Sequence, residues 1–153
     1  MLKELNILKI KHTFINMDDI QQWQKKVHVE SSLPAKDSQF AMFIGRWQPL
    51  HFGHIQLFNQ AFHIGKKVLI CIRDVAPDHK NPFTAEQVKE NIKEQLALLV
   101  NAGTIKVMII PDIQSIEFGR GVGYDIIEHI PPQEVGDISA TKIREEMRKD
   151  GKL

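Results

Sequence analysis

The chain has 153 residues, of which 42% are hydrophobic and 25% are charged. This length suits one domain with a buried core, and the composition is typical of a globular protein rather than a disordered or fibrous one. Twenty basic and nineteen acidic residues leave a net charge of +1. Because so small a net charge creates no field that would concentrate a polyanion, the composition argues against nucleic acid as a partner.

Cysteine usage and the N-terminus favour a reducing, cytoplasmic setting. The single cysteine, Cys71, lies inside an apolar run and is expected to be a buried, inert thiol. Residues 1–10 mix lysine and glutamate with leucine and isoleucine, so they lack the uninterrupted apolar core of a signal peptide. No stretch approaches transmembrane length, and we therefore expect no membrane partner.

Residues 1–38 differ from the rest of the chain and are interpreted as an N-terminal extension, followed by one domain over residues 39–153. The extension contains short apolar clusters, a helix predicted from Asp18 to Val27, and the turn-rich run Ser31 to Pro34. The pattern leaves open whether this extension packs on the domain or on another subunit, and with it the question of a homo-oligomer.

From residue 39 onward strands and helices alternate. Hydrophobic periodicity predicts, in chain order, a strand over 40–45, a helix that begins near 51 and includes Ile55, Phe58 and Phe62, a strand over 67–73, a helix over 84–101 and a strand over 105–110. This βαβαβ order predicts an α/β fold with a parallel sheet, helices on both faces and right-handed crossovers. Ligands of such sheets collect beyond the carboxyl ends of the strands.

The pattern after Pro111 is interrupted by glycines. A short helix is predicted over Tyr124 to Ile130, because Pro131 and Pro132 would end it there. A last helix is expected to begin at Ser139, which is a good N-cap before a run of helix-forming residues.

The segment from Phe43 to His54 carries the strongest chemical signal, because it lies where the first strand gives way to the first helix. Gly45 leaves room for an anion to approach backbone amides, and a helix that begins near His51 directs its N–H groups and positive dipole end outward. His51 and His54 are three residues apart, so both can donate hydrogen bonds to one phosphate. Such donors stabilise the charge of nucleotidyl transfer without a covalent intermediate.

A His-x-x-His pair also occurs on surfaces and in zinc sites. Zinc would need a third ligand, for which His63 and His79 are available. Neither a cysteine pair nor a His-Glu-x-x-His arrangement supports that alternative. We therefore predict no metal ligands among the protein side chains.

A second phosphate-binding candidate is the start of the last helix. Ser139 caps a helix whose free amides could hold an anion, and Arg144 follows one turn later. With Thr141 and Lys142, Arg144 could bind outer phosphates, since arginine offers a planar fork of donors and lysine a point charge. Taken alone this is a capped amphipathic helix, and only its pairing with the first segment favours a nucleotide site.

The two segments together resemble the nucleotidyltransferase superfamily of the cytidylyltransferase and adenylyltransferase type. Its two signatures are present as His51-Phe52-Gly53-His54 and Ile138-Ser139-Ala140-Thr141-Lys142-Ile143-Arg144. The chain is most similar to the archaeal-type nicotinamide mononucleotide adenylyltransferases in the runs Gly45-Arg46-Trp47-Gln48-Pro49, Lys80-Asn81-Pro82-Phe83-Thr84 and Pro111-Asp112-Ile113. The resemblance covers residues from about Phe40 to Met147 and implies a Rossmann-like fold.

The resemblance implies transfer of a nucleoside monophosphate from ATP or CTP to a phosphorylated small molecule, with release of pyrophosphate. The implied catalytic residues are His51, His54, Lys80 and Arg144, with Lys80 facing the acceptor's phosphate. The implied nucleotide-binding residues are Gly45, Arg46, Gly53, Ser139, Thr141, Lys142 and Arg120. Magnesium would be held mainly by the triphosphate, because this ion tends to keep water and phosphate ligands.

Two departures from the family pattern leave the substrates open. The family's Asn-Pro-Phe-Thr motif usually continues to a Glu-Arg pair, where this chain has Gln87-Val88. The stretch before the last helix is short, and its run Glu117 to Tyr124 resembles a segment of uncharacterised short nucleotidyltransferases. Arg120, flanked by glycines there, could reach an anion or could be one solvated charge on a surface loop.

Three alternatives accompany this reading. The chain could be a cytidylyltransferase that acts on an alcohol phosphate, or a nucleotide-binding module without catalysis. A fragment of a class I aminoacyl-tRNA synthetase would carry a related histidine turn. The chain is too short for such an enzyme, however, and lacks a lysine-rich loop signature and a basic patch for tRNA.

Overall fold

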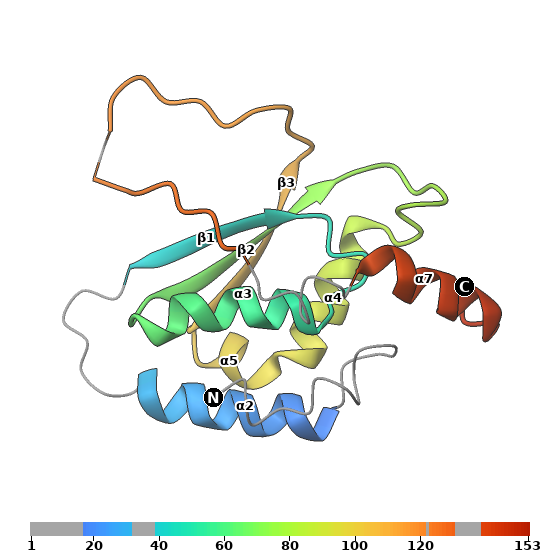
Figure 1. The fold of residues 1–153 in the computed structure, drawn as a ribbon, viewed down its shortest axis with the longest axis horizontal. Helices are drawn as coiled ribbons and strands as arrows, with labels where there is room; N and C mark the ends of the chain where they lie inside the picture. Colours follow the sequence, from blue (N-terminus) through green and yellow to red (C-terminus); the bar gives the residue numbers. More distant parts are fainter. Residues whose placement is uncertain (1–16, 32–38, 122, 131–138) are drawn as a thin grey trace.

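The computed structural model describes residues 17–31, 39–121, 123–130 and 139–153 (Figure 1). Its helices and strands are, in chain order, α2 (Met17–Ser31), β1 (Phe40–Gly45), α3 (Phe52–His63), β2 (Lys67–Asp74), α4 (Ala85–Gln95), α5 (Ala97–Asn101), β3 (Ile105–Pro111) and α7 (Ala140–Lys149). The three predicted strands, the helix after the first strand and the last helix are confirmed, each within about one residue of its predicted start.

The strands form one parallel sheet in the order β1-β2-β3. The α/β, Rossmann-like prediction is confirmed, whereas helices on both faces are not found in the described part of the chain. Both connections step across the sheet in the same direction, so two right-handed crossovers place their helices on the same face. Figure 1 shows α3, α4 and α5 together on that face.

The burial of alternate strand residues follows from this one-sided cover. Phe43, Ile70 and Val107 are register partners on neighbouring strands, and they belong to the core or pack against it. Met42 and Met108 point to the opposite face, where they are 60% and 44% exposed. The core therefore lies between one face of the sheet and the helices, where burial of apolar surface supplies most of the folding free energy.

The helix predicted over 84–101 is divided at Leu96 into α4 and α5. Its predicted start is confirmed, because Thr84 Oγ1 accepts from the Gln87 amide at 3.1 Å and Gln87 Oε1 accepts from the Thr84 amide at 2.9 Å. The break has a tertiary cause, the buried amide of Gln24 on α2. Gln24 Nε2 donates to the Gln95 carbonyl at 2.9 Å, and Gln24 Oε1 accepts from the Leu99 amide at 3.3 Å. A side chain thus stands between two groups that an uninterrupted helix would pair directly.

The helix predicted over Tyr124 to Ile130 is wrong, because residues 123–130 contain no helix. Ile126, Ile127 and Ile130 are 69%, 51% and 85% exposed, so this segment buries no apolar face that would stabilise a short helix. The predicted stop at residues 131 and 132 lies outside the described residues.

The N-terminal extension contributes a helix that packs on the domain. The helix predicted from Asp18 to Val27 is confirmed as α2. Trp23 Nε1 donates to Asn59 Oδ1 at 3.1 Å, and the Trp23 and Phe62 rings lie 5.8 Å apart. The sequence left open whether the extension packs on the domain or on another subunit, and these contacts show that residues 17–31 pack on the domain. Most of the predicted turn at 31–34 lies outside the described residues.

Within the described ranges, no helix combines the length and the apolarity that crossing a membrane would require. The cytoplasmic location and the oligomeric state stay predictions.

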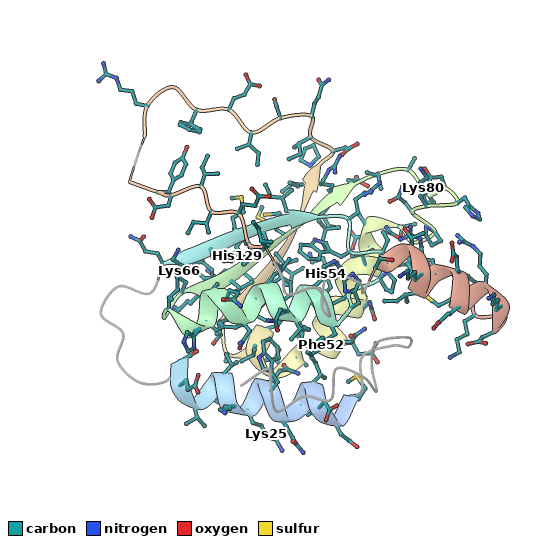
Figure 2. The ribbon with its side chains drawn as sticks, viewed as in Figure 1. Lys25, Phe52, His54, Lys66, Lys80 and His129 are labelled. Atoms are coloured by element: carbon teal, nitrogen blue, oxygen red, sulfur yellow. The ribbon has the colours of Figure 1, made fainter. Side chains whose placement is uncertain are left out.

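We expect Trp23→Ala to lower the free energy of unfolding by about 3 kcal/mol, because it removes a buried aromatic ring and leaves Asn59 without its partner. Urea unfolding monitored by circular dichroism measures this change. Lys25→Ala is the matched control, since Lys25 is exposed on the outer side of the same helix (Figure 2). Equal stability of the two variants would contradict the packing of α2 on the domain.

Candidate active site

The loop between β1 and α3 is shaped by Trp47. Trp47 has a positive φ of 53°, and the peptide bond between Gln48 and Pro49 is cis. The indole Nε1 donates to the Cys71 carbonyl at 3.0 Å, which ties the loop to β2. A Cβ on Gly45 would lie 3.0 Å from Trp47 Cε2, so the indole leaves little room for a side chain at this position. The sequence analysis explained Gly45 by the room it leaves for an anion, and it did not predict this contact with Trp47.

His51 and His54 cap the start of α3 and lie against each other. His51 is the N-cap, and its Nδ1 accepts from the Gly53 amide at 3.0 Å. His54 Nδ1 accepts from the His51 amide at 3.1 Å, and the two rings stack with centroids 3.7 Å apart. Because each Nδ1 is an acceptor, each neutral ring carries its proton on Nε2. The pair therefore retains two Nε2–H donors, while the Gly53 amide is already paired.

Burial keeps both imidazoles neutral at pH 7. It lowers the pKa of His51 from 6.5 to about 4. The pKa of His54 lies well below 6.5, first because of burial and then because of the nearby His51. The Trp47 and His54 rings meet edge to face, with ring centroids 4.6 Å apart. Neutral rings donate hydrogen bonds without offering a readily transferred proton, which suits stabilisation of a charged phosphate rather than acid catalysis.

The last helix is brought to this loop by Arg144, which is 8% exposed. Arg144 Nη1 donates to the Gln48 carbonyl at 2.7 Å, across 96 residues of sequence, and Nη2 donates to Thr141 Oγ1 at 3.3 Å. Burial, followed by the charges of Arg148 and Arg46, lowers the pKa of Arg144. The predicted N-cap is also confirmed, because Ser139 Oγ accepts from the Lys142 amide at 3.2 Å.

Gln48 joins three segments of the site and was not predicted as a site residue. Its side-chain amide pairs with the backbone of Phe83, donating to the carbonyl at 2.9 Å and accepting from the amide at 3.0 Å. Its own carbonyl receives Arg144. The only sequence signal was a polar residue inside the Trp47–Pro49 run, and its partners lie too far along the chain to be read from spacing.

The loop after β2 lies beside α7, because Arg148 Nη2 donates to the His79 carbonyl. Asp78 Oδ1 accepts from the amides of Lys80 and Asn81 at 2.8 and 2.7 Å. Lys80, which is exposed, extends from this loop (Figure 2). The positive charge of Arg46 also reaches this loop, since it contributes to the lowered pKa of Asp78 after the hydrogen bonds from Asn81 and Lys80.

Other predicted positions are not brought into these contacts. Arg120 is exposed in the segment that leaves β3 and leads away from α7 (Figure 1). His63 is the last residue of α3, and nine residues of helical rise separate it from His54 by about 13 Å. No group of three or more His, Cys, Asp or Glu side chains that could hold a metal occurs in the ranges that the structure describes.

We expect the wild-type protein to lose stability as the pH falls from 6.5 towards 4. Over this range the folded state binds fewer protons than the unfolded state, because the folded pKa of His51 is about 4 against 6.5. The full shift corresponds to about 3 kcal/mol of unfolding free energy. His51→Asn keeps an N-cap residue without this titration, so urea unfolding at pH 7.5 and 4.5 should show a smaller loss. His63→Asn is the control, and equal pH dependence in wild type and His51→Asn would refute the assignment.

Comparison with known proteins identifies several that are similar to this chain. Residues 42–101 match the cytidylyltransferase-like family. The nicotinamide/nicotinic acid mononucleotide adenylyltransferase of Acinetobacter baylyi is 38% identical over 55 residues, which are 35% of this chain and 29% of that protein. The nicotinamide-nucleotide adenylyltransferase of Methanococcus aeolicus is 32% identical over 95 residues, which are 60% of this chain and 51% of that protein.

A solved structure is also similar. It is the bifunctional NMN adenylyltransferase/ADP ribose pyrophosphatase of Francisella tularensis, complexed with AMP and a manganese ion. It is 34% identical, with a TM-score of 0.44, over 50% of this chain and 23% of that one. The matched region thus spans about half, or less, of the length of these relatives. This chain is therefore similar to the cytidylyltransferase-like family over residues 42–101, and it is also similar to the nicotinamide mononucleotide adenylyltransferases named above.

Proposed function

We propose that this protein transfers a nucleoside monophosphate from a nucleoside triphosphate to a phosphorylated small molecule and releases pyrophosphate. The observation that carries the proposal is the pair of stacked, neutral imidazoles at the start of α3, one loop away from the buried Arg144. The names of the relatives support ATP as the triphosphate and nicotinamide mononucleotide as the acceptor.

In the proposed reaction an oxygen of the acceptor's phosphate attacks the α-phosphorus of the triphosphate in line. The new bond joins that oxygen to the α-phosphorus, and the bond to the β-phosphate oxygen breaks to release pyrophosphate. The Nε2–H groups of His51 and His54 would donate to the charged phosphate oxygens in the transition state. No side chain needs to act as a nucleophile, because positioning and charge stabilisation supply the catalysis.

The last helix would hold the outer phosphates. Arg144 is fixed by Gln48, and Thr141 lies beside it on the first turn of α7. Ser139, Lys142 and Arg46 would complete this anion site, and Lys80 would contact the acceptor's phosphate. Arginine suits the site because its planar donors bind two phosphate oxygens at once.

Magnesium fits this arrangement as an ion bound mainly by phosphate and water. The described residues place cationic and neutral donors here, and no cluster of three ligating side chains was found among them. Mg²⁺ commonly takes its ligands from substrate phosphates and water, where it neutralises charge on the triphosphate.

We expect His54→Ala to lower kcat by 100-fold or more, roughly the effect of removing one transition-state donor, while it binds the triphosphate with near-normal affinity. Loss of the capping hydrogen bond should cost about 1 kcal/mol of stability, and loss of the ring's packing adds to this cost, so circular dichroism checks that the variant is folded. Pyrophosphate release measures kcat, titration calorimetry measures affinity, and His63→Ala is the control. Near-normal turnover by His54→Ala would refute the role.

We expect ATP with nicotinamide mononucleotide to be the preferred pair. Initial rates with ATP and CTP are measured against nicotinamide mononucleotide, glycerol phosphate, phosphocholine and phosphopantetheine. A strong preference for CTP and an alcohol phosphate would favour the cytidylyltransferase alternative. Tight triphosphate binding without turnover on any acceptor would favour a binding module.

A further inference from the structure

The carboxylate of Asp78 builds the turn that carries Lys80. One oxygen, Oδ1, accepts from the Lys80 amide at 2.8 Å, the Asn81 amide at 2.7 Å and Asn81 Nδ2 at 3.0 Å. The Asp78 amide in turn donates to the Asn81 carbonyl at 2.9 Å. A single side-chain oxygen therefore fixes the backbone on both sides of Lys80, as aspartate and asparagine do in turns of this kind.

The turn is attached to the rest of the site at both ends. Arg148 donates to the His79 carbonyl, and Phe83 pairs with the buried amide of Gln48. Asn81 is only 6% exposed, so the turn is seated in the domain rather than free above it. The turn thus spans from α7 to the loop that precedes His51.

Lys80 itself differs from its neighbours. Its side chain is exposed. The backbone amide of Lys80 donates to Asp78, but its side-chain ammonium makes no hydrogen bond or ion pair among the described residues. A lysine on a flexible stem gives up conformational entropy when it binds an anion, so a fixed backbone limits the freedom that must be lost. Asp78 supplies this fixed backbone without needing to touch the bound molecule.

The surroundings of Asp78 also determine its charge state. Hydrogen bonds from Asn81 and Lys80 lower the pKa of Asp78, and the positive charge of Arg46 adds to this effect. The carboxylate is therefore ionised at neutral pH and acts as a full acceptor for the three donors of its turn.

We infer that Asp78 is a positioning residue for the acceptor substrate, which holds Lys80 where it meets the acceptor's phosphate beside the histidine pair. This inference rests on the proposed function, in which Lys80 binds that phosphate. It predicts that Asp78 affects binding of the acceptor more than binding of the triphosphate, and that the geometry of the Asp78 side chain matters more than its charge.

Two substitutions separate geometry from charge. Asp78→Asn keeps an acceptor oxygen at the same reach and removes the charge, so it should bind nicotinamide mononucleotide within about twofold of wild type. Asp78→Glu keeps the charge, but its extra methylene displaces the acceptor oxygen. It should weaken binding about tenfold, as should Asp78→Ala.

The experiment measures binding of nicotinamide mononucleotide and of ATP to the full chain by titration calorimetry, together with KM for each substrate. Glu90→Ala is the matched control, because Glu90 is an exposed carboxylate on α4 outside this turn. Lys80→Ala combined with Asp78→Ala should bind the acceptor no more weakly than Lys80→Ala alone, because both changes act through one contact. Thermal midpoints check that each variant is folded.

Several results would overturn the inference. The first is that Asp78→Ala and Asp78→Glu both bind the acceptor as tightly as wild type, and the second is that Asp78→Asn binds it as weakly as Asp78→Ala. The third is that the variants lose as much affinity for ATP as for the acceptor. The fourth is that wild type does not bind the acceptor. Acceptor binding with the expected variant pattern, but without turnover on any triphosphate, would instead refute the proposed function and leave the positioning role supported.

Discussion

The arrangement of the candidate site depends on the hydrogen bond from the buried Arg144 guanidinium to the Gln48 carbonyl. Burying a guanidinium costs free energy unless its N–H groups find hydrogen-bond acceptors. The bonds from Arg144 to Gln48 and to Thr141 therefore allow α7 to pack here. Gln48 in turn holds Phe83 through its side chain. One glutamine therefore connects the start of the site, the loop after β2 and the last helix.

The histidine pair combines a structural and a chemical role. The Nδ1 atoms cap α3, and this use fixes the tautomer that leaves the Nε2–H groups available. Burial keeps both rings neutral, and Trp47 packs against His54, which favours hydrogen-bond donation over proton transfer. Changing either ring would therefore affect both the helix start and the proposed transition-state contacts.

Charge is concentrated locally in a chain whose net charge is only +1. The charges of Arg46 and Arg148 both influence Arg144, and the carboxylate of Asp78 partly offsets them. Such a cluster attracts an anion at short range, while the protein as a whole exerts little long-range attraction. This distribution suits a small phosphorylated ligand better than a polyanion.

Local patterns in the sequence determined the strands, the caps and the histidine pair. Thr84 and Ser139 each bond to a residue three positions later, and His51 and His54 are likewise three apart, so one helical turn contains the whole interaction. Spacing alone can reveal contacts of this range.

Only the tertiary structure decided the rest, because its causes join distant segments. Gln24 divides the predicted helix at Leu96 from 71 residues away, and Arg144 finds Gln48 across 96 residues. The exposed isoleucines of residues 124–130 form no helix, because no apolar face receives them there. Both crossovers step the same way across the sheet, which leaves Met42 and Met108 exposed. Periodicity shows which residues can be buried, but packing between segments decides which of them are.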